Sequence, residues 1–156
     1  MKEIQLTKGQ NTLVDDDDFE FLNQWRWHCQ TTPDGHNYAM NRRAGLMHRL
    51  IMNVISKDKG IYIDHINHHT LDNRKSNLRI CTQTQNTRNR LPQKDGRSKF
   101  KGVCWHKIGK KWMTRIRTGE KYLYLGLYSD EKEAAIAYNE AAKKYHGEFA
   151  YLNQVD

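Results

Sequence analysis

At 156 residues the chain has room for one domain of ordinary size or two small ones, and its formal net charge is +8, from 26 Lys and Arg against 18 Asp and Glu. Three widely separated cysteines without a CxxC pair argue against a disulfide scaffold, and no stretch approaches the roughly 20 apolar residues of a membrane span. With no secretion signal at the N-terminus either, we expect a cytoplasmic protein with no membrane partner.

The first residues predict a small β-rich part with one short helix. Residues 4–7 alternate apolar and polar side chains, and residues 12–14 begin a second strand after a turn that contains glycine. The acidic run at residues 15–18 favours a helix start, because carboxylates stabilise a helix N-terminus. We therefore expect a helix from about residue 17 to residue 24.

The next segment predicts a hairpin and a second short helix. Residues 25–29 and 38–41 are expected to pair as strands around Pro33-Asp34-Gly35, which is a turn sequence. Residues 47–52 then indicate a short helix that leads into the most polar motif of the chain.

That motif is predicted to lie on a strand, a polar loop, a returning strand and a helix. The expected bounds are residues 61–65, 67–76, 78–81 and 83–89, with Thr82 as the helix N-cap. Asp64 supplies a carboxylate for a divalent cation, and His65 an imidazole that can take a proton from water near neutral pH. Neighbouring side chains of a strand point to opposite faces, so the chain must bend here for both to reach one phosphate.

The sequence Asp64-His65-Ile66-Asn67, followed by Asn77 and Asn86, resembles the HNH family of metal-dependent nucleases in its phage and homing-endonuclease branch, over about residues 47–90. The resemblance implies a ββα-metal fold with His65 as general base and Asn77 orienting its ring. It also implies that Asp64 and Asn86 ligate one divalent cation, Mg2+ or Mn2+. Asn86 stands where the family name has its last histidine, and since an amide is a weaker ligand than imidazole, we expect modest metal affinity.

Other polar side chains near the motif leave alternatives open. His68 and His69 are either metal ligands or solvated loop residues, and His48 is either a packed helix residue or a neighbour of the phosphate. Guanidinium groups are rarely buried without a partner, so the arginines of this region are expected to hold phosphates. They are Arg49, Arg74, Arg79 and Arg88.

The basic charge is concentrated in one part of the chain. Residues 70–121 carry 15 basic and 3 acidic side chains, whereas residues 1–50 carry 6 basic and 7 acidic ones. Such a density is costly unless a polyanion neutralises it, and nucleic acid is the usual one. The alternative is a basic surface that serves only solubility.

The C-terminal part has the pattern of a sheet covered by one helix. After a linker at residues 92–98, we expect strands at 100–105, 111–118 and 121–127 and a helix at 131–145 with a narrow alanine-rich face. On the middle strand Arg115 and Arg117 alternate with an apolar set that should meet the helix, so they point outward beside Tyr122 and Tyr124. Five rim residues are expected to contact phosphates: Lys101, His106, Lys107, Lys110 and Lys111.

This pattern resembles the AP2 DNA-binding domain over residues 98–153. The matching residues are Gly102-Val103, Lys111-Trp112, Ile116-Arg117, Leu125-Gly126, Ala134-Ala135-Ile136-Ala137-Tyr138-Asn139 and Leu152-Asn153. The resemblance implies that the open sheet face, with Arg115 and Arg117, reads bases in the major groove. Cys104, Tyr122 and Tyr124 stand where plant AP2 domains have arginines, so the plant target sequence does not carry over. Outward cations could instead only keep a sheet edge soluble.

The predicted fold class is α+β, with a nuclease domain at residues 1–91, a linker at 92–98 and an AP2-like domain at 99–156. The predicted activity is hydrolysis of phosphodiester bonds in double-stranded DNA, by a monomer or a homodimer, in a bacterial host's cytoplasm if the chain is phage-encoded. The alternative is a non-catalytic DNA-binding regulator that retains the HNH scaffold.

Overall fold

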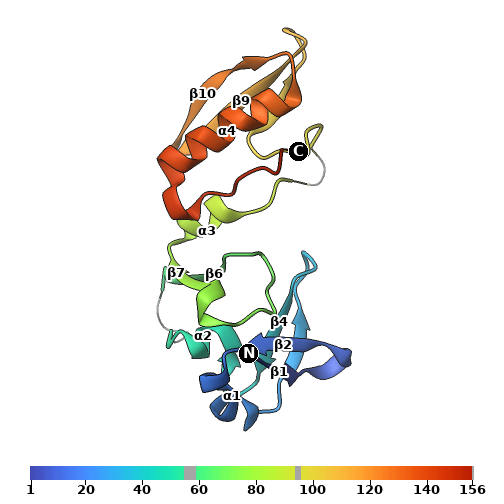
Figure 1. Ribbon diagram of the computed structural model, residues 1–156, viewed down its shortest axis with the longest axis vertical. Coiled ribbons are helices and arrows are strands. Elements are labelled where there is room, and N and C mark those ends of the chain that lie inside the picture. The colour runs from blue at the N-terminus through green and yellow to red at the C-terminus, as the bar shows by residue number, and fades with distance from the viewer. Residues whose placement is uncertain (55–58, 94–95, 156) are drawn as a thin grey trace. The chain divides into compact units, whose positions relative to one another are not determined.

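The computed structural model describes residues 1–54, 59–93 and 96–155 (Figure 1). The chain divides into two compact units, Met1–Gln83 and Thr84–Asp156. Helices and small sheets occur in both units, so the expected α+β class is confirmed at that level. None of the helices in the described ranges is both long and apolar enough to cross a membrane.

The first unit begins with a hairpin and a helix. Strands β1 (Lys2–Gln5) and β2 (Asn11–Val14) pair antiparallel, and a single 3-10 turn, η1 (Thr7–Gly9), joins them. Helix α1 (Asp16–Asn23) begins one residue before the expected start, with Asp15 at its N-cap. The Asp15 carboxylate does not cap the helix, because it accepts a hydrogen bond from the backbone N–H of Lys75 at 2.7 Å.

A second small sheet follows, with the order β3-β4-β5. Its strands are β3 (His28–Thr31), β4 (Asn37–Asn41) and β5 (Gly45–Leu46), and helix α2 (Met47–Ile51) comes directly after them. The first strand starts three residues later than expected. The reason is Trp27, which is fully buried in the core and donates its indole N–H to the carbonyl of Leu22 at 2.8 Å.

The predicted motif forms a third hairpin, of β6 (Tyr62–His65) and β7 (Leu78–Cys81). The loop between these strands contains a 3-10 turn, η2 (Lys75–Asn77), and is tied to β2. The backbone N–H of Leu13 donates to the carbonyl of Leu71, and the N–H of Asn73 to the carbonyl of Leu13, both at 2.8 Å. The loop is therefore an ordered part of the first unit.

Helix α3 (Gln83–Asn89) has the expected bounds, but almost all of it falls in the second unit. The contact boundary after Gln83 thus differs from the predicted limit at residue 91. The functional domains 1–91 and 99–156 stay a prediction, and residues 94–95 of the predicted linker lie outside the described residues.

The second unit is a three-stranded antiparallel sheet covered by one helix (Figure 1). Strands β8 (Val103–His106), β9 (Lys111–Thr118) and β10 (Lys121–Tyr128) lie in the order β10-β9-β8. Helix α4 (Glu131–His146) packs on them and is followed by a 3-10 turn, η3 (Gly147–Phe149).

Small side chains let α4 approach the sheet closely. Ala134, Ala135 and Ala142 are completely buried, and the hydroxyl of Thr114 on β9 donates to the carbonyl of Ala134 at 3.0 Å. Asp130 caps the helix by accepting from the N–H groups of Lys132 and Glu133. The expected alanine face is therefore the contact between helix and sheet.

Candidate functional site

Asp64 and His65 are the last two residues of β6, and both are only 6% exposed. In the β6–β7 register Asp64 lies opposite Arg79, and His65 lies opposite Leu78. The chain turns directly after the pair, where the N–H of His68 donates to the carbonyl of His65 at 3.0 Å. The common site that the sequence predicts for both side chains stays a prediction.

The imidazole of His65 is bonded by Asn73. Its Nε2 lies 3.3 Å from Oδ1 of Asn73. Thr12 sets the orientation of the Asn73 amide. Its Oγ1 donates to the carbonyl of Leu71 at 2.7 Å, so it accepts from Nδ2 of Asn73, also at 2.7 Å. The oxygen of Asn73 therefore faces the ring, which favours the tautomer with the proton on Nε2 of His65 and the lone pair on Nδ1.

The surroundings of His65 also keep its ring neutral. Burial lowers the pKa of His65 below its usual value, although the bond to Asn73 and the charge of Asp64 act in the opposite direction. The ring of His48 packs edge-on at 5.2 Å between ring centroids, and the ring of Tyr38 lies at 6.1 Å. A neutral imidazole with a lone pair can accept a proton from water at pH 7.

The bonds of Asn77 lie within the β6–β7 loop, and its predicted role of orienting the His65 ring stays a prediction. Its Oδ1 accepts the backbone N–H of Asn67 at 3.0 Å, and its Nδ2 donates to the carbonyl of Asp72 at 2.8 Å. Asn77 thus closes the β6–β7 loop, while Asn73 takes the bond to His65. Sequence reasoning missed Asn73, because its place beside His65 depends on a bond to Thr12, 61 residues away.

Asp64 forms a buried ion pair with Arg79. Nε and Nη2 of Arg79 lie 2.8 and 2.6 Å from Oδ2 of Asp64, and the two side chains are 13% and 7% exposed. Arg79 was predicted to clamp phosphates, but in the structure its guanidinium binds the candidate metal ligand. A cation on Oδ2 would compete with it.

Of the other arginines that were predicted to hold phosphates, two form hydrogen bonds within the protein and one belongs to the second unit. Arg74 binds Asp72 through two bonds of 2.7 Å and thereby holds the pKa of that carboxyl below its usual range. Arg49 reaches the carbonyl of Ile61 at 3.4 Å. Arg88 is half-buried on α3 in the second unit. Phosphate contacts by these arginines stay a prediction.

His48 is a packed residue. It is 7% exposed, its ring contacts His65 and Tyr38, and burial lowers the pKa of His48 to about 3. For the two loop histidines the alternatives stay open: His69 is exposed, and His68 is half-buried with a left-handed φ of 65°.

The predicted metal ligands fit a hard cation by their chemistry. Asp64 offers a carboxylate and Asn86 an amide oxygen, which are donors for Mg2+ or Mn2+ rather than for zinc. Asn86 lies half-buried on α3 in the second unit, so its pairing with Asp64 stays a prediction. Among the described residues there is no cluster of three or more His, Cys, Asp or Glu that could hold a metal.

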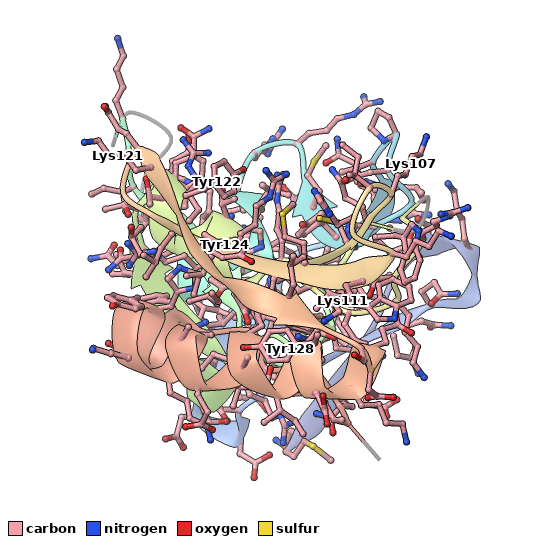
Figure 2. The ribbon with its side chains drawn as sticks, turned by 90° about the horizontal axis from the view of Figure 1, so that it is seen from above. Lys107, Lys111, Lys121, Tyr122, Tyr124 and Tyr128 are labelled. Atoms are coloured by element: carbon pink, nitrogen blue, oxygen red, sulfur yellow. The ribbon has the colours of Figure 1, made fainter. Side chains whose placement is uncertain are left out.

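The open face of the second unit's sheet carries the expected side chains. Arg115 and Arg117 are exposed, whereas Thr114 and Ile116, which alternate with them along β9, are buried on the side of α4. Arg117 lies opposite Tyr122 and Arg115 opposite Tyr124 in the β9–β10 register, so the four side chains share one face. Figure 2 shows Tyr122 and Tyr124 on the side of β10 that faces away from α4, with Tyr128 toward the helix.

This open face combines cations with aromatic rings. The guanidinium of Arg115 lies over the ring of Tyr122, 4.7 Å from its centroid, which fixes its direction. Tyr122 and Tyr124 are 59% and 57% exposed. Lys107 and Lys111 are exposed where β8 turns into β9. Nδ1 of His106 accepts the N–H of Gly109 at 3.0 Å and orders that turn.

Lys101, which was predicted as a phosphate contact, binds backbone carbonyls in the structure. Its Nζ donates to three backbone carbonyls, of Thr87 at 3.3 Å, Arg88 at 2.6 Å and Arg90 at 2.7 Å. Burial lowers the pKa of Lys101 to about 8. Its ammonium is therefore bound to the end of α3 instead of being presented to a ligand.

Comparison with known families covers both parts of the chain. Residues 56–88 match the model of the HNH endonuclease family, and residues 98–148 match that of the AP2 domain. These ranges contain the β6–β7 hairpin with most of α3, and the sheet with α4, respectively.

Individual relatives show the same two parts. An uncharacterized HNH endonuclease of Acanthamoeba polyphaga mimivirus is 30% identical over 152 residues, which are 96% of this chain and 78% of the relative. APETALA2-like protein 2 of Oryza sativa subsp. indica is 48% identical over 60 residues, or 37% of this chain and 14% of the relative. An ethylene-responsive transcription factor of Arabidopsis thaliana, WRI1, is 47% identical over 60 residues, with the same coverage of 37% and 14%. The chain thus spans only a small part of these plant proteins.

Proposed function

The chain belongs to the HNH endonuclease family and combines its HNH segment with an AP2 domain, and we propose from this premise that it is a metal-dependent DNA endonuclease. The family assignment supports nuclease activity, and the AP2 domain supports DNA binding. The proposal assigns hydrolysis to the β6–β7 hairpin with α3, as a ββα-metal motif, and recognition of duplex DNA to the sheet of the second unit.

In this proposal His65 is the general base. Its Nε2–H is bound to Asn73, so Nδ1 is the atom that removes a proton from the attacking water. Burial favours the neutral ring, which keeps the base available at pH 7. Asn77 contributes indirectly, by closing the loop that carries Asn73.

Asp64 and Asn86 are proposed to hold the divalent cation, Mg2+ or Mn2+. Such a cation, when bound, stabilises negative charge on the phosphate and on the departing 3′-oxygen. The ion pair with Arg79 fixes the direction of the Asp64 carboxylate. In this proposal Arg79, which lies against the Asp64 carboxylate, contacts the scissile phosphate when Asp64 engages the cation.

The sheet of the second unit is proposed to dock in a major groove. Arg115 and Arg117 project from its open face and would contact base edges, with Tyr122 and Tyr124 beside them. Lys107, Lys111 and His106 would bind phosphates at the turn between β8 and β9. One active site per chain makes nicking the natural outcome, and a homodimer would permit a double-strand break.

The proposal includes a setting for the activity. A homing or genome-processing role in the cytoplasm of a bacterial host, for a phage-encoded chain, follows from the phage branch that the motif resembles. The mimivirus relative supports a viral connection without naming the host.

The observation that carries the nuclease proposal is a buried His65, bonded through Nε2 to Asn73, directly beside a buried Asp64. The test incubates supercoiled plasmid with the purified chain and Mg2+, with Mn2+, and with a chelator. Conversion to open-circular or linear DNA that needs the metal is expected. Intact plasmid under all metal conditions, with binding retained, would overturn the proposal.

A second candidate function is that of a non-catalytic DNA-binding regulator. The observation that favours it is the ion pair of Arg79 with Asp64, which occupies the carboxylate that a metal would need. The same plasmid assay separates the two functions, because a regulator binds the plasmid and never cuts it.

A further inference from the structure

Lys101 binds the C-terminal end of helix α3. A helix leaves its last four carbonyls without partners inside the helix, and a cation there is favourable. The ammonium of Lys101 reaches the carbonyls of Thr87 and Arg88 in the last turn of α3 and of Arg90 just after it. Three bonds from one side chain, of 2.6, 2.7 and 3.3 Å, hold this helix end in position.

Lys101 is itself fixed from the C-terminal side. Oδ1 of Asn153 accepts the N–H of Lys101 at 2.7 Å, and Nδ2 of Asn153 donates to the carbonyl of Lys101 at 3.1 Å. Asn153 is in turn held by Asn139 on α4, through bonds of 2.7 and 2.9 Å between side chain and backbone. A continuous polar chain therefore runs from α4 through Asn153 and Lys101 to α3.

A second connection reinforces the first. The backbone N–H of Tyr151 donates to the carbonyl of Arg88 at 3.4 Å, and Nζ of Lys101 lies 5.6 Å from the centre of the Tyr151 ring. Figure 1 shows the segment after α4 running back past α3. Helix α3 is thus built into the same compact unit as the sheet that carries Arg115 and Arg117.

We propose that Lys101 is a positioning residue: it clamps α3 to the rest of the DNA-binding unit and thereby fixes the direction in which Asn86 is presented to a metal ion. This inference rests on the proposed function. It predicts that loosening of α3 weakens metal binding by Asn86. Loss of the clamp should therefore weaken the response to metal more than the affinity for DNA.

The partial burial of Lys101 supports a clamp over a phosphate contact. A pKa lowered to about 8 reflects loss of solvent around the ammonium, whereas a phosphate-binding lysine stays accessible to the backbone of DNA. Lys107 is exposed to solvent at the β8–β9 turn, whereas Lys101 is partly buried. Lys107 is therefore a matched control.

The test compares Lys101→Met, Lys101→Arg and Lys107→Met in the full chain. Three quantities are measured: hydrogen exchange of the α3 amides, affinity for linearised plasmid, and the Mg2+ or Mn2+ concentration for half-maximal cleavage of supercoiled plasmid. For Lys101→Met we expect α3 exchange and the metal requirement to rise by about tenfold, since the helix end loses its donors, with DNA affinity unchanged. Lys101→Arg should restore both in part. Lys107→Met should weaken DNA binding alone.

Two results would overturn the clamp. One is unchanged exchange of the α3 amides in Lys101→Met. The other is a loss of DNA affinity equal to that of Lys107→Met with an unchanged metal requirement, which would make Lys101 a phosphate contact. A wild-type chain that cuts no DNA would refute the nuclease proposal and the role of Asn86 with it, while the exchange measurement would still decide whether Lys101 clamps α3.

Discussion

Asn73 and His65 form the hydrogen bond that sets the tautomer of the candidate base, with Oδ1 of Asn73 lying 3.3 Å from Nε2 of His65. Both residues are buried, and the amide of Asn73 also donates a hydrogen bond to the hydroxyl of Thr12. The bond therefore links a strand of the N-terminal hairpin to the chemistry at the end of β6. It gives the β-rich start of the chain a functional role beyond packing.

The first prediction concerns this bond. Asn73→Ala should lower the cleavage rate by about 10- to 100-fold, which is the usual effect of removing the partner that orients an imidazole. Asn73→Asp keeps an acceptor toward His65 and should retain more activity than the alanine variant. Plasmid cleavage is measured together with thermal unfolding, and Asn11→Ala, an exposed change on β2, is the control. Equal rates for Asn73→Ala and the wild type would contradict the assignment.

A second prediction separates cutting from binding. His65→Ala removes the proposed base and should abolish metal-dependent cleavage, whereas the sheet of the second unit is untouched. Gel-shift binding to the same plasmid fragments should therefore stay nearly equal to that of the wild type. Cleavage at the wild-type rate by His65→Ala would discard the base assignment.

Most of the secondary structure could be predicted from the sequence, because it follows local signals. The bounds of α3 and of β9 agree with the expected 83–89 and 111–118, and turns that contain glycine mark both ends of β9. The strand expected at residues 25–29 starts only at His28, because burial of Trp27 overrides local alternation. The two-residue β5 has too short a pattern to be found.

The candidate site could be predicted only where its residues are neighbours in sequence. Asp64 and His65 are adjacent in the sequence, so their place at the end of one strand could be predicted. The outward direction of Arg115 and Arg117 followed from the alternation of side chains along a strand. The role of Asn73 and the clamp by Lys101 depend on partners 61 and 11–14 residues away. Residue type alone gives no signal for such pairings, and Lys101 in a basic stretch looked like a phosphate contact.

The third prediction tests the sheet as the DNA-binding surface. Arg115→Ala combined with Arg117→Ala should weaken duplex binding by roughly 1–3 kcal/mol for each arginine that contacts a base. Wild-type binding should also fall steeply with salt, because phosphate contacts release counterions. The matched control removes two exposed lysines of α4, Lys132→Ala with Lys144→Ala. A titration that shows unchanged affinity and site preference in the arginine variant would mean that another surface reads the DNA.

The fourth prediction is an acid sensitivity caused by His48. Its pKa is lowered from 6.5 to about 3 by burial first, then by the neighbouring His65 and Arg49. Below pH 6.5 the unfolded chain therefore binds a proton that the folded chain refuses, so the free energy of unfolding falls as pH decreases toward 3. Above pH 6.5 this effect of His48 is absent. At pH 5 it should lower the free energy of unfolding by about 2 kcal/mol.

Denaturant unfolding at pH 7.5 and at pH 5 measures this difference. His48→Phe keeps a ring against His65 and Tyr38 and should reduce the loss on acidification. Some loss should remain, because the lowered pKa of His65 acts with the same sign. His36→Phe, at an exposed turn, should leave the difference unchanged. The same acid loss in His48→Phe as in the wild type would rule His48 out as its source.

The last prediction tests the close packing that supports the DNA-binding sheet. Gly102 has φ +78°, and a Cβ there would lie 2.0 Å from Cδ2 of Tyr138 and 2.8 Å from the carbonyl oxygen of Arg115. Gly102→Ala must therefore displace a buried ring or the backbone of β9, whereas Gly119→Ala, at φ +64°, meets nothing within 4 Å. Strain from positive φ alone costs about 1 kcal/mol, and overpacking adds roughly 1–3 kcal/mol, so the first variant should be clearly less stable in thermal unfolding. Because Arg115 follows the backbone that moves, Gly102→Ala should also weaken duplex binding at temperatures where it is folded. Equal melting temperatures of the two variants would show that β9 can shift without loss of stability. The direction of Arg115 would then not depend on this contact.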